Sequence, residues 1–163
     1  MKFRFLLIII LSFFNSNLSI ANNIAYLDLN YILNNSTTGK NLIKKLEEIN
    51  AKNLDILKKE QTVLNKERDD IEKTKNILSK NELNNKLEIL NDKLQKFAKK
   101  QDDLSNDFKN IRKTEMENFL KKINPIIENY MLENDIDLIL KNESIYISKS
   151  DYNISTKIIN LID

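Results

Sequence analysis

Apolar residues recur along residues 83–111 with spacings that alternate between four and three. The positions are Leu83, Leu87, Leu90, Leu94, Phe97, Leu104, Phe108 and Ile111, with Gln101 as the one polar interruption. Such spacing puts a single apolar stripe on a helix and is typical of a helix that packs against another helix. The pattern therefore predicts a long helix with a helical partner.

A second helical pattern precedes this one and runs from Lys40 to about Leu78 without an internal proline or glycine. Two rows repeat every seven residues: Leu42, Ile49, Ile56, Val63 and Ile77, broken by Asp70, and Ile43, Leu57, Leu64, Ile71 and Leu78, broken by Asn50. Rows one residue apart lie about 100° apart on a helix, so the apolar stripe is wider than one seam requires. We therefore expect the second row, with off-seam residues such as Ile89, to stay exposed.

The segment between the two patterns carries a signal for a new helix. Ser79 followed by Glu82 fits a capping box, and Leu78 and Leu83 are spaced as a hydrophobic staple around it. Two helices joined by so short a break run antiparallel. The sequence predicts a coiled-coil helical hairpin over residues 40–117, with its turn near 79–82, and each helix would be roughly 60 Å long.

The remaining segments, residues 22–39 and 118–163, predict a small body. Strands are expected at "IAYLDL", "IDLILKN" and "SIYISKS", a short helix is expected at the end, and Asn124 with Pro125 marks either a kink or a fresh helix start. The fold class is α+β, a small β-sheet body with the hairpin as its arm. Residues expected in the body core or in oligomer contacts are Ile24, Tyr26, Leu27, Ile136, Leu138, Ile145 and Ile147. Because so small a sheet buries little surface, we expect a homo-oligomer.

Residues 1–21 have the pattern of a secretory signal peptide. Lys2 and Arg4 precede an apolar run, and Ser19 and Ala21 are small residues placed before a cleavage point. The apolar run is too short to span a bilayer as a helix, so cleavage near Ala21 is expected. Without this segment the chain carries 24 basic and 24 acidic residues, so no overall charge favours binding to nucleic acid.

Composition also excludes several kinds of chemistry. The chain has no His and no Cys, and Gly39 is its only glycine, so zinc sites, thiolate nucleophiles, catalytic triads and glycine-rich phosphate loops all lack necessary residues. Asp28 and Asp137 lie in apolar runs, but we expect them to face outward rather than to form a catalytic pair. The sequence predicts a protein that is not an enzyme and binds no cofactor.

Three blocks, "IAYLDLNYIL", "NPIIENYMLENDIDLIL" and "SIYISKSDYNISTKIINLID", together resemble the start and end of the Skp/OmpH family of periplasmic chaperones. The resemblance covers residues 22–163. It implies a trimer in which small sheets form a β-barrel base and three arms enclose a cavity. It also implies that the protein holds unfolded outer-membrane proteins in the periplasm without ATP. The neutral charge weakens the implied contact with lipopolysaccharide or anionic membrane surfaces.

On this interpretation, the expected client contacts are the arm residues Leu64, Ile71, Ile77 and Ile89. The alternative for each is that it pairs across the hairpin, which is the usual role of a heptad seam. A different function is also open, because an exported coiled-coil structural or assembly protein that reaches a specific folded envelope partner would share all of these features.

Overall fold

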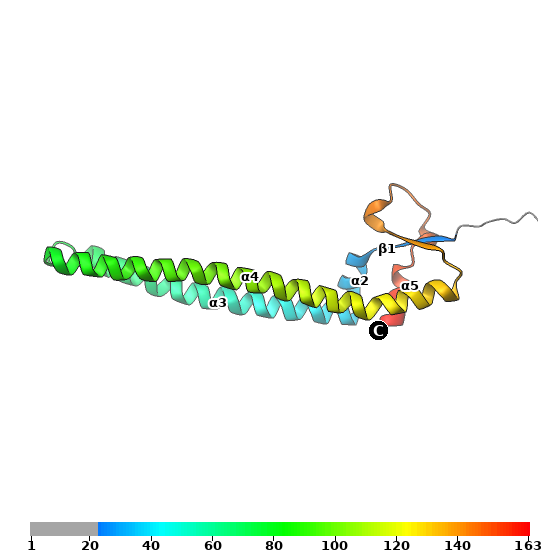
Figure 1. Cartoon of the computed structure of the whole chain (residues 1–163), viewed down its shortest axis with the longest axis horizontal. Coiled ribbons are helices and arrows are strands. Elements are labelled where there is room, and N and C mark those ends of the chain that lie inside the picture. Colours follow the sequence, from blue (N-terminus) through cyan, green and yellow to red (C-terminus); the bar gives the residue numbers. More distant parts are fainter. Residues whose placement is uncertain (1–22) are drawn as a thin grey trace, which may run out of the picture.

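The computed structural model describes residues 23–163, which form a long two-helix arm attached at one end to a small body (Figure 1). The expected signal peptide, with its cleavage point near Ala21, lies outside the described residues. The arm consists of α3 (Thr37–Thr74) and α4 (Lys80–Glu133), which lie side by side and run in opposite directions. The predicted helical hairpin is confirmed.

The turn between the arm helices spans residues 75–79, slightly before the predicted turn near 79–82. Ser79 caps α4, and Glu82 completes the capping box by accepting the backbone N–H of Ser79 at 3.0 Å. The preceding helix ends at Thr74, four residues earlier than its apolar pattern. Residues 75–78 form turns instead, with the N–H groups of Ile77 and Leu78 both donating to the carbonyl oxygen of Thr74.

Helix α4 continues without a break from the tip of the arm into the body. Pro125 lies inside it, so the fresh helix start considered for Asn124 and Pro125 does not occur. Proline removes one backbone hydrogen bond, but Phe119 and Ile123, on the same stretch of helix, are buried in the body core. Tertiary packing therefore holds this segment helical.

The body joins the two ends of the described chain in one parallel sheet. Strand β1 (Ile24–Leu27) pairs with β2 (Leu138–Lys141), with Ile24 opposite Leu138. Helices α2 (Leu29–Asn35) and α5 (Ser155–Ile162) pack beside it. The core residues are Ala25, Leu27, Ile32, Leu42, Phe119, Ile123, Ile154 and Ile158.

The strand expected at residues 144–150 is wrong. Short 3-10 helices, η1 (Asn142–Ser144) and η2 (Ser150–Tyr152), occupy its two ends, and the described sheet has two strands. Tyr146 is fully exposed and Ile147 is 85% exposed. The alternating pattern indicated a strand, but no described strand pairs with this segment to satisfy its backbone hydrogen bonds.

The arm meets the body at a tight elbow between α2 and α3. Ser36 is buried and caps α3 by accepting the N–H of Gly39 at 3.0 Å. A carboxylate oxygen of Asp163 accepts the N–H of Thr37 at 2.8 Å, so the end of α5 is tied to the start of α3. A Cβ atom on Gly39 would lie 2.0 Å from the carbonyl oxygen of Leu33, which is why only glycine fits this position.

Candidate functional site

The two arm helices are joined by a short apolar cluster in the distal half of the arm. Leu64 of α3 packs with Leu90 and Phe97 of α4, and Leu57 and Ile71 lie against them. The cluster is separate from the core of the body. The arm therefore has its own core.

Ion pairs across the hairpin fix the alignment of the two helices. Lys93 Nζ lies 2.6 Å from Glu67 Oε1, and Lys100 Nζ lies 2.6 Å from Glu60 Oε2. Each pair is spaced seven residues from the other on both helices, so they form a ladder along one side of the seam. These pairs are partly exposed, so they contribute more to alignment than to stability.

The row of α3 that we expected to be exposed is in fact the seam. Leu64 is 4% exposed, so its expected place on an open surface is wrong, and Ile71 is half-buried against the same cluster. The physical reason is that a seam tolerates no charge, and Asp70 interrupts the other row. That other row includes Val63 and Ile77, which are exposed.

Ile77 and Ile89 are both exposed on the distal part of the arm. Ile77 is 84% exposed in the turn at the tip, and Ile89 is 49% exposed on α4 nearby. Further exposed apolar side chains along the arm are Leu54, Val63, Leu87 and Leu94. An arm with a small core and many exposed apolar groups resembles an interaction surface more than a simple spacer.

The stretch of α3 between the body and the distal cluster has no fully buried side chain. Asn50 occupies the seam row but is exposed, and no residue of α3 between Leu42 and Leu64 is buried. Within the described residues, no hydrogen bond or ion pair joins the helices between the Lys45–Glu115 pair and the Glu60–Lys100 pair. In this middle part several apolar side chains are half-buried, as at Ile49, Ile56 and Phe108.

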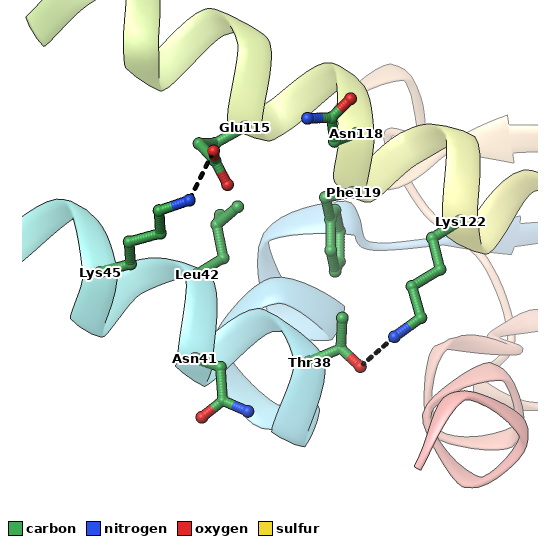
Figure 2. Close-up of a pocket in the computed structure, with 8 residues that line it drawn as sticks. All are labelled: Thr38, Asn41, Leu42, Lys45, Glu115, Asn118, Phe119 and Lys122. Carbon is green, nitrogen blue, oxygen red and sulfur yellow. Dashed lines mark hydrogen bonds and ion pairs between the residues drawn. The ribbon is translucent and has the colours of Figure 1, made fainter.

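A pocket of about 290 Å³ lies at the root of the arm, between α3 and α4 (Figure 2). Leu42 and Phe119 give it an apolar floor. On one side Lys45 Nζ lies 2.7 Å from a carboxylate oxygen of Glu115, and on the other Lys122 Nζ donates to Thr38 Oγ1 at 3.3 Å.

The predicted body residues divide between core and surface. Leu27 is buried, and Tyr26, Ile136 and Ile145 are half-buried. Ile24 and Leu138, which are paired across the sheet, are 39% and 47% exposed. The body thus retains an exposed apolar surface beside its sheet, to which the exposed Ile147 adds.

The two aspartates in apolar runs have structural roles. Asp28 caps α2 by accepting the N–H of Tyr31 at 2.8 Å, and its other carboxylate oxygen accepts from Asn142 at 3.2 Å. Asp137 is exposed and accepts the N–H of Asn23 at 3.3 Å. Each of the two carboxylates therefore accepts a hydrogen bond from a backbone N–H, which explains why an aspartate lies in each apolar run.

Two side chains on the arm have shifted pKa values, and both shifts arise from hydrogen bonds at the surface of the arm. The Ser79 hydroxyl and backbone N–H hold the pKa of Glu82 below its ordinary value. A hydrogen bond to Asp103, together with its negative charge, raises the pKa of Lys99. Both groups are exposed, so neither shift indicates a catalytic cleft.

Residues 23–163 contain neither a metal-binding cluster nor a membrane-spanning helix. No group of three or more acidic side chains there is arranged to hold a metal ion. No helix in that range is long and apolar enough to cross a membrane.

Comparison with known proteins identifies the family. The model of the OmpH-like outer membrane protein family matches residues 23–162. The chain belongs to this family. OmpH-like proteins are periplasmic chaperones and not enzymes, as the sequence predicted.

A solved structure of low sequence identity has the same fold as this OmpH-like chain. It is a crystal structure of a protein described as a candidate OmpH-like outer membrane chaperone from Caulobacter crescentus. The TM-score is 0.78 at 15% identity, over 86% of this chain and 83% of that one. No curated protein sequence matches this chain.

Sequence reasoning missed the root pocket of this OmpH-like protein and assigned the seam to the wrong side. The pocket could not be found because it depends on how α3 and α4 are aligned. The seam left a usable signal in Asp70. A buried seam excludes an unpaired charge, so the row that Asp70 interrupts is the less suitable of the two.

Proposed function

We propose that this OmpH-like protein is an ATP-independent holding chaperone. It is exported with cleavage near Ala21, binds unfolded outer-membrane β-barrel proteins between its arms, and prevents their aggregation before membrane insertion. The observation that carries this proposal is the exposed apolar surface of the distal arm, above all Ile77 and Ile89.

The physical match is between this surface and an unfolded barrel strand. Such strands carry alternating apolar residues, which aggregate when they are exposed to water. Many weak apolar contacts retain a chain without fixing one pose, and each contact can be replaced by another. Release then requires no driven cycle, because insertion into the membrane is the more favourable state for the client.

The proposed working form is a trimer whose sheets assemble into a common base. The exposed apolar residues of the body support this association: Ile24, Leu138, Tyr146 and Ile147. The segment 144–150 has a strand pattern but no strand partner in the described chain, and pairing with another copy would supply one. Three arms joined at such a base would surround a client from several sides.

The test is light scattering after a urea-unfolded outer-membrane barrel protein is diluted into buffer with the purified protein and without nucleotide. We expect suppressed scattering at a fixed small ratio of protein to client. The double variant Ile77→Ser, Ile89→Ser should suppress it less, because exposed contacts are lost while the buried arm cluster remains.

The matched control is Leu132→Ser, which removes an apolar side chain that is 80% exposed in the body instead of the arm. Its suppression of scattering should equal that of the original protein. A client that aggregates as fast as in buffer alone would contradict the holding function. The arms would then reach a specific folded partner, as an exported structural or assembly protein would.

A further inference from the structure

The root pocket combines an apolar floor with an excess of positive charge. Leu42 and Phe119 form the floor between two lysines (Figure 2). Glu115 neutralises Lys45, whereas the described contact of Lys122 is the neutral hydroxyl of Thr38. The side chains lining the pocket therefore carry a net charge of +1, which favours a ligand with one negative charge.

The surroundings strengthen this preference. Residues 40–48 and 109–122, which form the root of the arm on both helices, carry eight Lys/Arg and four Asp/Glu. The described chain as a whole is formally neutral, so the root of the arm is more positive than the chain average. This local excess adds to the attraction of an anion to the pocket.

We propose that the root pocket binds the C-terminus of an unfolded chain whose last residue has a large apolar side chain. The terminal carboxylate would pair with Lys122, and the side chain would lie on Leu42 and Phe119. The proposal depends on the holding function in one respect: the holding function is the reason why the ligand is an unfolded chain.

The size of the pocket selects this occupant over a lipid. Ligand pockets commonly range from about 300 to 1,000 Å³, and this one, at about 290 Å³, is at the small end. Its apolar lining, Leu42 and Phe119, is enough to cover one terminal side chain and too small to cover a long acyl chain. An unfolded chain has one such terminus, with the carboxylate and the last side chain on the same carbon.

Binding can be measured by the fluorescence anisotropy of a short peptide labelled at its N-terminus and ending in phenylalanine with a free carboxylate. The whole purified protein is titrated into it. We expect the affinity to fall about two- to fivefold when the peptide ends in an amide, and by a similar factor in Lys122→Gln, because one partly exposed ion pair is lost. A peptide ending in alanine should also bind more weakly.

The matched control is Lys121→Gln, which removes the same charge from the adjacent residue, outside the pocket lining. It should lower the affinity much less than Lys122→Gln does, because only the general positive field is reduced. Equal binding of the acid and the amide, or equal losses in the two lysine variants, would overturn the proposal. Binding of decanoate with no binding of the peptide would also overturn it and would assign the pocket to a lipid.

The peptide titration and the aggregation test can fail separately. A protein that suppresses client aggregation but does not bind the peptide contradicts the pocket assignment and leaves the holding function standing. A protein that binds the acid selectively but fails to suppress aggregation contradicts the holding function and supports the pocket assignment.

Discussion

At the residue scale, the single glycine occupies a position that has no room for a side chain. Gly39 lies in the first turn of α3, where its backbone contacts Leu33 of the preceding helix. Because glycine has no side chain, the start of α3 can approach the backbone of α2 closely at the elbow. The direction in which the arm leaves the body therefore depends on this close approach.

Gly39→Ala should destabilise the protein by about 1–3 kcal/mol, the usual cost of forcing an extra methyl group into a packed site. The reason is the 2.0 Å approach to the Leu33 carbonyl oxygen, a backbone atom that cannot turn aside. Urea unfolding followed by circular dichroism measures the loss. The neighbouring exposed variant Lys40→Ala is the control, and equal stability of the two variants would contradict the prediction.

At the element scale, α4 depends on its cap because it starts at the exposed tip of the arm. Ser79 and Glu82 satisfy each other's backbone N–H groups there. Because hydrogen bonds from Ser79 lower the pKa of Glu82 in the folded state, the ionised carboxylate stabilises the helix start.

Ser79→Ala should return the pKa of Glu82 towards its ordinary value and should destabilise the tip of the arm near neutral pH. A lowered folded pKa gives stability that is present above the unfolded pKa and is lost as the pH falls through the folded pKa. The difference between the variant and the original protein should therefore shrink in acid.

Carboxyl NMR titration of Glu82 measures the pKa, and helix melting at about pH 7 and about pH 3 measures the stability difference. Ser105→Ala makes the same change inside α4, away from its start, and should leave the titration of Glu82 unaltered. An unchanged pKa in Ser79→Ala would show that the capping box does not form in solution.

The elements that were predicted correctly are those whose signals come from residues close to one another in the sequence. The capping box fixed the start of α4, and the seven-residue period fixed the two arm helices. The choice of seam row was wrong because it depends on how two helices are rotated against each other. The predicted strand around Ile147 was wrong because a strand also needs a partner, and alternation alone does not provide one.

At the scale of the whole molecule, the exposed segment around Tyr146 and Ile147 predicts self-association. Replacing both residues with Ser should shift the protein towards the monomer and leave its helix content unchanged, since neither side chain is buried in the described chain. Sedimentation across a range of concentrations measures the shift. Leu161→Ser, which changes a residue of α5 that is 52% exposed, is the control.

A monomeric mass for the original protein at micromolar concentration would contradict association through the body. A mass unaffected by the double substitution would instead place the contact elsewhere, at Ile24 and Leu138 on the sheet.

The parallel sheet also sets an order in which the chain can fold. The ion pairs across the arm join residues 26, 40 and 70 positions apart, whereas Asn23 and Asp137 bond across 114 positions. Contacts between residues close in sequence form faster than distant ones. The two arm helices can therefore pair, starting at the turn near Ser79, before β1 pairs with β2. On the proposed export route the N-terminus emerges first, and the backbone of β1 stays unpaired until β2 follows. For that interval the chaperone is itself a partly folded chain, with its arm formed before its base.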